Sequence, residues 1–313
     1  MAIHLHTSYR DPDIAIDLGT ALTRIASGSL SQTVVPSKVG GRPVLRSGTI
    51  ANADDAVELL RPLLLRVRKF GVLRPHAVAC APSDATGEEL ETLRECVMKA
   101  GAATVVIVPE ILAAAIGGGM DVSSHYAGMI VDIGEGITEC AVIRAGKIIE
   151  KHTRRVGCFD LRRHVLQAVS SMTKLHVPDA EAERLLRETG IAGKQGALRI
   201  FFTGCSGHGA RHGTVSVAGE RIHEEIEPVI ASITGVVTSL LDALSPDVGC
   251  QIIDSGICLS GGGALLRGMG RHLERLTGIP VTSPSNPLDA VVAGARDMLP
   301  VMSIVNRHLR KLQ

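Results

Sequence analysis

The chain has 313 residues, of which 45% are hydrophobic, and a formal net charge of +1. This length exceeds one ordinary hydrophobic core, so we expect two lobes. No basic block is present to follow a phosphate backbone, and no Trp, two Tyr and four Phe leave little to stack on bases, so the composition disfavours a nucleic-acid partner.

The cysteines and the N-terminus indicate the cytoplasm. Seven cysteines lie in apolar segments without a C-x-x-C pair, as expected of reduced, buried thiols. The first residues lack the basic start and apolar core of a signal peptide, and no run approaches the roughly twenty apolar residues of a membrane span. We therefore expect a cytoplasmic protein, with a peripheral position on a membrane left open.

Residues 13–27 and 129–143 both predict a strand, a glycine turn and a return strand. The two segments align as IDLGTALTRIA over VDIGEGITECA. Matched pairs are Asp17 with Asp132, Gly19 with Gly134, Thr23 with Thr138, and Ala26 with Ala141. A hairpin that recurs near the start of each half predicts a duplicated fold, the alternative being a chance similarity of two hairpins.

The glycine turns of these hairpins predict anion binding. Glycines that flank one residue, as in Gly134-Glu135-Gly136, leave backbone N–H groups able to meet an anion without a Cβ in the way. A single glycine turn usually only reverses the chain. The repeat favours a phosphate-type turn in each lobe.

The rest of the first half alternates strands and helices, which is typical of an α/β lobe. The helix over 54–70 begins with two acids and contains Pro62, which should bend or split it. The other expected elements are strands at 76–81 and 104–108 and helices at 86–100 and 110–116.

The second half repeats this order after its hairpin. We expect a strand at 147–156, helices at 159–172, 180–188 and 220–244, strands at 199–203 and 214–217, and a closing segment at 288–299. Pro228 should interrupt or bend the long helix. A strand at 256–259 runs into Ser260-Gly261-Gly262-Gly263-Ala264 before a helix at 265–276, which predicts a third anion- or nucleotide-contacting element.

Two common nucleotide-binding motifs are absent, and one possible metal motif is weak. Neither a GxxxxGK[ST] loop nor a GxGxxG fingerprint is present, which removes the main support for P-loop and dinucleotide sites. Cys205, His208 and His212 in GCSGHGARHG suggest a metal, but no fourth ligand is evident and incidental histidines in a glycine loop are commoner.

Four motifs resemble those of one family. IDLGTALT, VDIGEGITECAVI, PEILAAAIG and ICLSGGGALLRGM followed by TGIPV resemble the phosphate-1, phosphate-2, connecting-helix and adenosine motifs of the MreB/Mbl proteins, bacterial actin-like ATPases of the actin/Hsp70/sugar-kinase superfamily. The resemblance runs from about residue 13 to residue 299. It implies an α/β actin-like ATPase fold with two duplicated lobes around a nucleotide cleft.

The resemblance also implies a domain plan and a function. Lobe I would be 1–125 and lobe II 126–313, with a helical small subdomain at about 160–248 and the adenosine motif at 257–268. The implied ligands are ATP or GTP with Mg²⁺, hydrolysed slowly and coupled to filament assembly. The implied partners are further copies of the chain, cell-wall synthesis proteins and the inner membrane surface, in the regulation of cell shape.

By the same resemblance, individual residues receive roles. Asp17 and Asp132 would hold Mg²⁺ through water, as suits its preference for carboxylate and water oxygens. Glu110 would orient the hydrolytic water, the alternative being a charge that stabilises a helix N-terminus; Thr138 would support the turn or the water, or simply fit a strand. The other implied cofactor-binding residues are Gly19, Thr20, Ala21, Leu22, Gly134, Glu135, Gly136, Glu183, Gly261, Gly262, Gly263 and Ala264.

The chain departs from the family at several positions. Only residues 37–41 stand where the family inserts a small subdomain of lobe I that contributes filament contacts, so a non-polymerising scaffold for wall-synthesis or division proteins is the alternative function. Leu22 replaces an asparagine, Glu135 and Ile137 replace Gly and Thr, and Leu186 replaces a common lysine. Val72 and Leu73 stand where the family often carries a membrane-touching loop; a plain helix-to-strand connection is the equal alternative.

Overall fold

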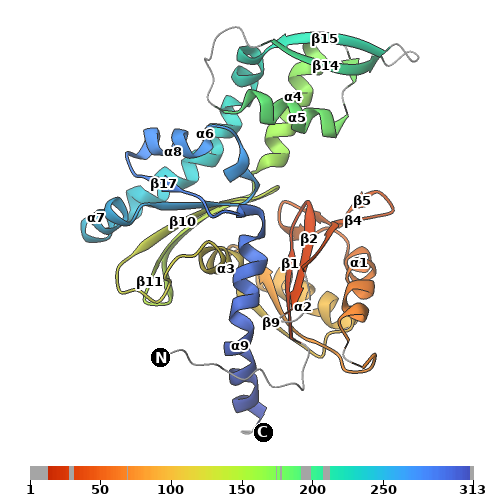
Figure 1. The fold of residues 1–313 in the computed structure, drawn as a ribbon, viewed down its shortest axis with the longest axis vertical. Coiled ribbons are helices and arrows are strands. Elements are labelled where there is room, and N and C mark those ends of the chain that lie inside the picture. The colour runs from red at the N-terminus through yellow and green to blue at the C-terminus, as the bar shows by residue number, and fades with distance from the viewer. Residues whose placement is uncertain are drawn as a thin grey trace. The chain divides into compact units, whose positions relative to one another are not determined.

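The computed structural model describes residues 13–27, 32–68, 70–173, 175–176, 178–191, 199–206 and 212–310 (Figure 1). The chain forms two compact units. Unit 1 consists of Met1–Ser123 and Leu288–Gln313, and unit 2 of Ser124–Pro287. Each unit is described by itself below.

Each unit contains a five-stranded sheet of the same topology. In unit 1 the order is β3 (Thr33–Pro36), β2 (Leu22–Ser27), β1 (Asp13–Leu18), β8 (His76–Ala81), β9 (Thr104–Pro109). In unit 2 the order is β12 (Lys147–Arg154), β11 (Thr138–Arg144), β10 (Gly128–Ile133), β16 (Ile257–Ser260), β17 (Val281–Thr282). In both, the first three strands pair antiparallel and the last two join in parallel. The predicted duplication of an α/β, actin-like fold is confirmed.

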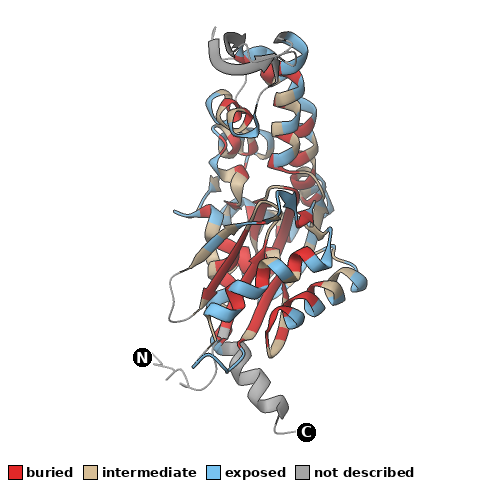
Figure 2. Cartoon of the chain, turned by 90° about the vertical axis from the view of Figure 1, so that its right-hand side faces the viewer, coloured by how far each residue is buried: buried red, intermediate tan, exposed pale blue. Residues whose placement is uncertain are grey.

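Helices cover the unit 1 sheet and bury its apolar strands (Figure 2). They are α1 (Ala53–Arg66), α2 (Gly87–Ala100), α3 (Glu110–Gly117) and α9 (Ala290–Arg310). Asn52 caps α1 by accepting from the amides of Asp54 and Asp55, and Thr86 and Glu89 form a capping box at α2. Local sequence thus fixes where these two helices begin.

The C-terminal helix α9 packs on unit 1 through an unusually close helix crossing. A Cβ on Gly117 of α3 would lie 1.8 Å from the Ala290 oxygen, and one on Gly294 would lie 1.9 Å from the Ala113 oxygen. Only glycine permits this approach. The sequence placed residues 288–313 in lobe II; the structure groups them with unit 1, since glycine on both helices lets α9 dock there.

Unit 2 adds helices and a second, small sheet. The helices are α4 (Cys158–Thr173), α5 (Asp179–Thr189), α6 (Gly219–Ala243), α7 (Pro246–Ser255) and α8 (Met269–Thr277). The small sheet has the order β13 (Leu175–His176), β14 (Arg199–Ser206), β15 (His212–Ala218). The subdomain predicted at about 160–248 therefore contains strands as well as helices.

Helix α6 is a core element of unit 2. Among the described helices, it has the length and apolar composition that could cross a membrane. Its residues Ile222, Ile226, Ile230 and Ile233 are fully buried in the hydrophobic core, beside the strands and helices of unit 2. Core packing accounts for its apolar character.

Neither Pro62 nor Pro228 interrupts its helix. Pro62 lies inside a continuous α1 and Pro228 inside a continuous α6, with buried residues on both sides of each proline, so of the two predicted outcomes, a bend or a break, the break does not occur. The expected helix at 265–276 is instead a 3-10 turn, Gly262–Leu265, followed by α8. Between β3 and α1 the chain forms only the two-residue strands β4 (Lys38–Val39), β5 (Arg42–Pro43), β6 (Leu45–Arg46) and β7 (Thr49–Ile50).

Candidate functional site

The glycine turn of unit 2 rests on the start of α4. The Gly134 amide donates to the Ile137 oxygen at 2.9 Å and closes the turn. The amides of Cys158 and Phe159 donate to the oxygens of Gly134 and Glu135 at 3.0 and 2.8 Å. A Cβ on Gly157 would lie 2.6 Å from both of these oxygens, so glycine is required for the contact. The turn is therefore held in one position.

Asp132 lies directly before this turn and is 3% exposed. The Ser260 hydroxyl, from the parallel neighbour β16, donates to its Oδ1 at 2.5 Å. Its cross-strand partner on β11 is a second buried acid, Glu139. Ser260 orients the predicted metal-binding carboxylate within a buried acidic setting.

The adenosine-motif glycines make close contact with the end of β10. A Cβ on Gly261 would lie 2.4 Å from the Ile133 oxygen, and a Cβ on Gly263 would lie 2.4 Å from the Ile133 Cβ. Gly261 also has φ of 77° and ψ of −176°, a conformation open essentially to glycine alone. The structure thus assigns these two glycines to packing on β10, and Gly262 and Ala264 lie in the same 3-10 turn region.

Glu135, at the tip of the turn, is bound by Arg162 of α4. One guanidinium nitrogen of Arg162 donates to Glu135 Oε2 at 2.8 Å and the other donates to Oε1. The hydrogen bond to Glu135 raises the pKa of Arg162. Sequence analysis placed Glu135 at the phosphates and did not identify its counter-charge.

Charged residues of several predicted sites affect the buried thiol of Cys158, the first residue of α4. Burial is the main cause that raises the pKa of this thiol to about 12. The charges of Glu135, Asp132 and Glu183 act in the same direction, whereas that of Arg162 lowers the pKa. Burial and negative charge therefore both keep this thiol protonated.

Helix α5 presents a charged face that lines a surface hollow. The hollow is lined by Ala180, Glu183, Arg184, Arg187 and Glu188. Arg187 donates to Glu183 at 2.6 Å. Leu186, which stands where the family commonly has a lysine, is 2% exposed and belongs to the core, so the bases of this face are Arg184 and Arg187.

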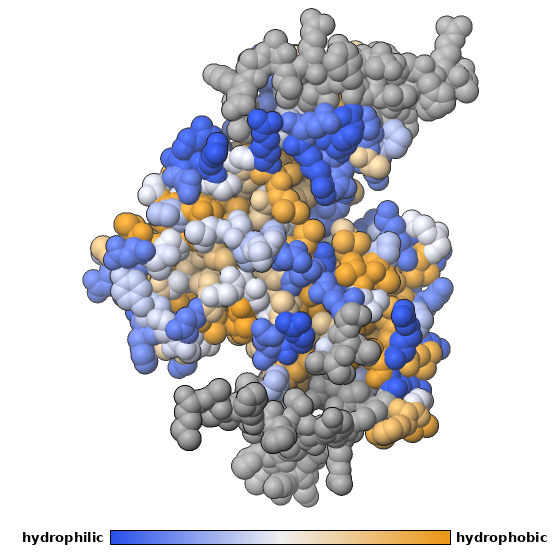
Figure 3. All heavy atoms as spheres, viewed as in Figure 1, coloured by the Kyte–Doolittle hydropathy of each residue, from blue (hydrophilic) through white to orange (hydrophobic). Residues whose placement is uncertain are grey.

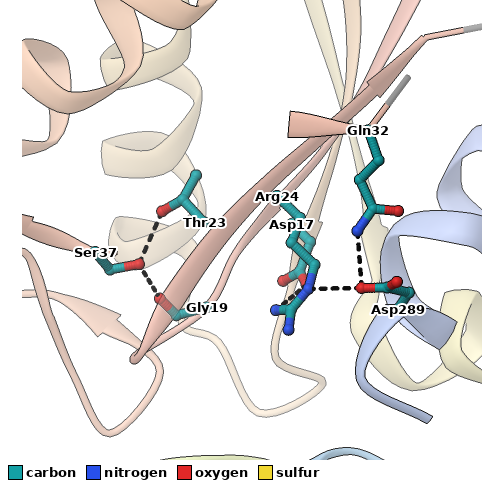
Figure 4. Close-up of polar contacts among 7 residues, drawn as sticks. All are labelled: Asp17, Gly19, Thr23, Arg24, Gln32, Ser37 and Asp289. Atoms are coloured by element: carbon teal, nitrogen blue, oxygen red, sulfur yellow. Dashed lines mark hydrogen bonds and ion pairs between the residues drawn. The ribbon is translucent and has the colours of Figure 1, made fainter. Parts of the chain in front are cut away.

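The glycine turn of unit 1 is tied down by Ser37, which directly follows β3 (Figure 4). Its hydroxyl donates to the Gly19 oxygen at 2.6 Å and accepts from the Thr23 hydroxyl at 2.8 Å. Its amide donates to the Ala21 oxygen. The Thr20 hydroxyl accepts from the Gly48 amide at 3.0 Å.

Asp17 is 5% exposed and lies beside a buried arginine (Figure 4). Arg24, its cross-strand partner on β2, has a guanidinium nitrogen 3.6 Å from Asp17 Oδ2. The same guanidinium donates to Asp289 Oδ1 at 3.0 Å, and Gln32 donates to that oxygen at 2.7 Å. Arg24 thus supplies a positive charge next to the predicted metal ligand.

The two remaining predicted catalytic residues lie at element starts. Thr138 begins β11, is fully buried and donates its hydroxyl to the Val156 oxygen at 2.8 Å. This bond gives the hydroxyl a role in holding the turn. Glu110 is the first residue of α3 and is partly exposed.

A family model, "MreB/Mbl protein", matches residues 33–307. The chain belongs to the MreB/Mbl family. The cell shape-determining protein MreB of Escherichia coli (strain K12) is 30% identical over 274 residues, which cover 86% of this chain and 78% of that protein. The family membership agrees with the resemblance drawn from the four motifs.

Solved structures share the fold. MreB 5 of Spiroplasma citri, solved with AMPPNP, has a TM-score of 0.86 at 22% identity and covers 96% of this chain and 99% of that one. The MamK double helical filament has a TM-score of 0.78 at 17% identity, covering 91% and 98%. At these identities the likeness establishes the actin-like fold of this MreB/Mbl chain.

The residues fit a magnesium ion unequally. Carboxylate oxygens are the ligands Mg²⁺ prefers, and Asp132 offers one that Ser260 orients. Asp17 has Arg24 beside it, a cation that competes for the same charge. Among the described residues no group of three His, Cys, Asp or Glu side chains could hold a metal, and His208 of the GCSGHGARHG segment lies outside them.

Sequence analysis missed Arg24 and Arg162. A signal for Arg24 was present, because the repeat alignment sets it against Glu139, a reversal of charge within two otherwise similar hairpins. Arg162 carries no such signal, because its partner lies 27 residues earlier and only the fold joins them.

Proposed function

We propose that this MreB/Mbl-family chain binds ATP or GTP with Mg²⁺ and self-associates in a nucleotide-dependent way. The observation that carries the proposal is the convergence in unit 2. The turn 134–136 rests on the start of α4, and Asp132, which Ser260 orients, lies directly before this turn. A glycine turn beside an oriented carboxylate suits a metal-bound phosphate.

The proposed roles follow the geometry of each turn. The backbone around Gly19, Thr20 and Ala21 and around Gly134 and Gly136 contacts phosphate oxygens. Asp132 holds the hydrated Mg²⁺ more directly than Asp17, whose charge is offset by Arg24. The ion supplies charge neutralisation for the phosphates when bound. Glu110 orients the hydrolytic water as a general base. Slow hydrolysis accompanies assembly.

Nucleotide binding is supported by a structural neighbour. MreB 5 of Spiroplasma citri was solved with AMPPNP, and its fold covers 96% of this chain. Self-association is supported in the same way by MamK, whose similar fold was solved as a double helical filament. We therefore propose nucleotide binding and self-association for this chain as well.

The proposed membrane contact is the loop after α1. Phe70 and Val72 are 82% and 72% exposed, and Leu73 is 43% exposed. Arg68 and Arg74 flank them. Figure 3 shows several hydrophobic areas on unit 1 separated by hydrophilic side chains. Val72 and Leu73 together contribute about 3 kcal/mol if both side chains are fully buried in lipid, so stable attachment requires many copies in one filament.

In the cell, the proposed filament lies at the cytoplasmic face of the membrane. There it regulates cell shape together with cell-wall synthesis proteins. Family membership supports this role, since the relative in Escherichia coli is a cell shape-determining protein.

One observation favours a second function. Where the family inserts a subdomain, this chain has the short hairpin β4–β5, residues 38–43. A chain without those contacts would act as a nucleotide-dependent scaffold that binds wall-synthesis or division proteins and does not polymerise.

Calorimetry tests the nucleotide step and pelleting tests the assembly step. Saturable binding of Mg-ATP or Mg-GTP to the folded chain is expected, and its absence would contradict the proposal. Pelleting with phosphatidylglycerol vesicles and Mg-ATP should decrease when Val72 and Leu73 are changed to Ser. Ile253→Ser, an exposed apolar residue of α7, is the matched control. Nucleotide binding without assembly would support the scaffold.

A further inference from the structure

An ion pair between Glu135 and Arg162 lies at the tip of the proposed phosphate turn of unit 2. Their side chains are only 17% and 19% exposed, and the guanidinium contacts both carboxylate oxygens. The backbone oxygen of Glu135 is also fixed, by the Phe159 amide at 2.8 Å. The acid is therefore held at the turn by the same helix that carries its arginine.

Stability alone gives little reason for such a pair. Desolvating two charges costs about as much as their attraction returns, so a mostly buried ion pair is weak evidence for a stabilising role. The guanidinium fork of arginine, however, matches a phosphate as well as a carboxylate, with two parallel hydrogen bonds. Arg162 thus already has the geometry of a phosphate ligand while Glu135 occupies it.

The surrounding charge points the same way. The hydrogen bond to Glu135 and, to a smaller extent, the charge of Glu183 raise the pKa of Arg162, and Asp132 acts on the neighbouring thiol of Cys158. A polyphosphate entering this acidic neighbourhood adds further negative charge. Phosphate binding in this neighbourhood requires a positive charge to offset the acids, and Arg162 supplies one.

We propose that Arg162 is a phosphate-binding residue and that Glu135 is its built-in competitor. Without nucleotide, the Glu135 carboxylate occupies the guanidinium. The terminal phosphate of a nucleotide displaces the carboxylate and takes over its hydrogen bonds. The inference rests on the proposed nucleotide-binding function, and it explains why an acid is tolerated at the tip of a phosphate turn.

Three variants test the exchange: Glu135→Gln, Arg162→Gln and the double variant. The affinity of each for Mg-ATP and Mg-ADP is measured by calorimetry, with thermal unfolding as a check that each is folded. Arg163→Gln is the matched control, because it removes the same charge from an exposed position one residue along α4.

The two single variants should change affinity in opposite directions. Glu135→Gln removes the competitor and should tighten Mg-ATP binding by about tenfold, the range of one close charge contact. Arg162→Gln removes the ligand and should weaken it by about tenfold or more. The double variant should fall between the two, and Arg163→Gln should stay within about twofold of wild type.

A purely structural pair predicts another pattern. If the pair only fixes α4 to the turn, Glu135→Gln and Arg162→Gln both lower the melting temperature and both weaken binding. That result, or unchanged affinity in a folded Arg162→Gln, overturns this inference while leaving the proposed function intact. A wild type that binds no nucleotide overturns both.

Discussion

The hairpins β1–β2 and β10–β11 share a backbone plan but differ in charge. In each, an acid precedes the glycine turn and a buried threonine follows it. Thr23 is hydrogen-bonded to Ser37, which follows β3, and Thr138 is hydrogen-bonded to Val156, which follows β12. Across the strands, however, Asp17 faces Arg24, whereas Asp132 faces Glu139.

This difference shows how one fold can hold two electrostatic settings. In unit 1 the acid is offset by Arg24, which also binds Asp289 beside α9. In unit 2 the acid is oriented by Ser260 and lies among other acids. The buried threonines and the turns are common to both because they maintain the backbone. The charges across the strands differ: the partner of Asp17 is Arg24, and the partner of Asp132 is Glu139.

The largest expected effect in this comparison concerns Gly261, which packs on the end of β10 in unit 2. Gly261→Ala places a Cβ 2.4 Å from the Ile133 oxygen, in a backbone conformation closed to alanine. It should destabilise unit 2 by about 4 kcal/mol. Gly19→Ala, with its nearest contact at 2.9 Å, should cost about 1–2 kcal/mol. Chemical denaturation measures both; equal losses would contradict this contrast.

The next effect concerns Arg24, the cross-strand partner of Asp17 in unit 1, whose counterpart in unit 2 is an acid, Glu139. Arg24→Gln removes a buried cation that contacts two carboxylates, and should destabilise the chain by about 3 kcal/mol. Asp17→Asn in the same background should recover part of the loss, because it removes one of the uncompensated charges. A double-mutant cycle by thermal unfolding measures the coupling; additive losses would show that Arg24 and Asp17 act independently.

Nucleotide binding should respond unequally to loss of the two acids. Asp132→Ala should weaken Mg-nucleotide binding by about 100-fold, since this carboxylate is the better-placed magnesium ligand. Asp17→Ala should weaken it by less than about tenfold, because Arg24 already offsets its charge. Calorimetry with and without Mg²⁺ provides the measurement. Equal effects would indicate that both acids hold the ion alike.

The smallest effect is a pH dependence to which two buried thiols of unit 2 contribute. Burial raises the pKa of Cys140 and Cys158 from 9.0 to about 12. Between these values the folded thiols keep a proton that the unfolded thiols lose, so stability is present below pH 9.0 and is lost as the pH rises. At pH 10 the loss should be about 1 kcal/mol per thiol. Cys140→Ala and Cys158→Ala should flatten the profile; an unchanged slope would contradict the assignment.

The sequence predicted the backbone better than the charges. Both hairpins and the duplicated sheets follow from turn glycines and strand alternation, which are local signals. The ion pair between Glu135 and Arg162 does not follow from local signals, because only the fold brings these two residues together. The docking of α9 on unit 1 was also missed, since Gly117 and Gly294 acquire meaning only when the two helices cross. Pro62 and Pro228 do not break their helices, where buried residues on both sides of each proline pack against the core.

The central claim is that unit 2 builds a phosphate site around Asp132 and the start of α4. Calorimetric titration of Mg-ATP and Mg-GTP into the folded wild-type chain tests it most directly. The account predicts saturable, magnesium-dependent binding of one nucleotide per chain. No heat of binding from a chain shown to be folded, with either nucleotide, would contradict it.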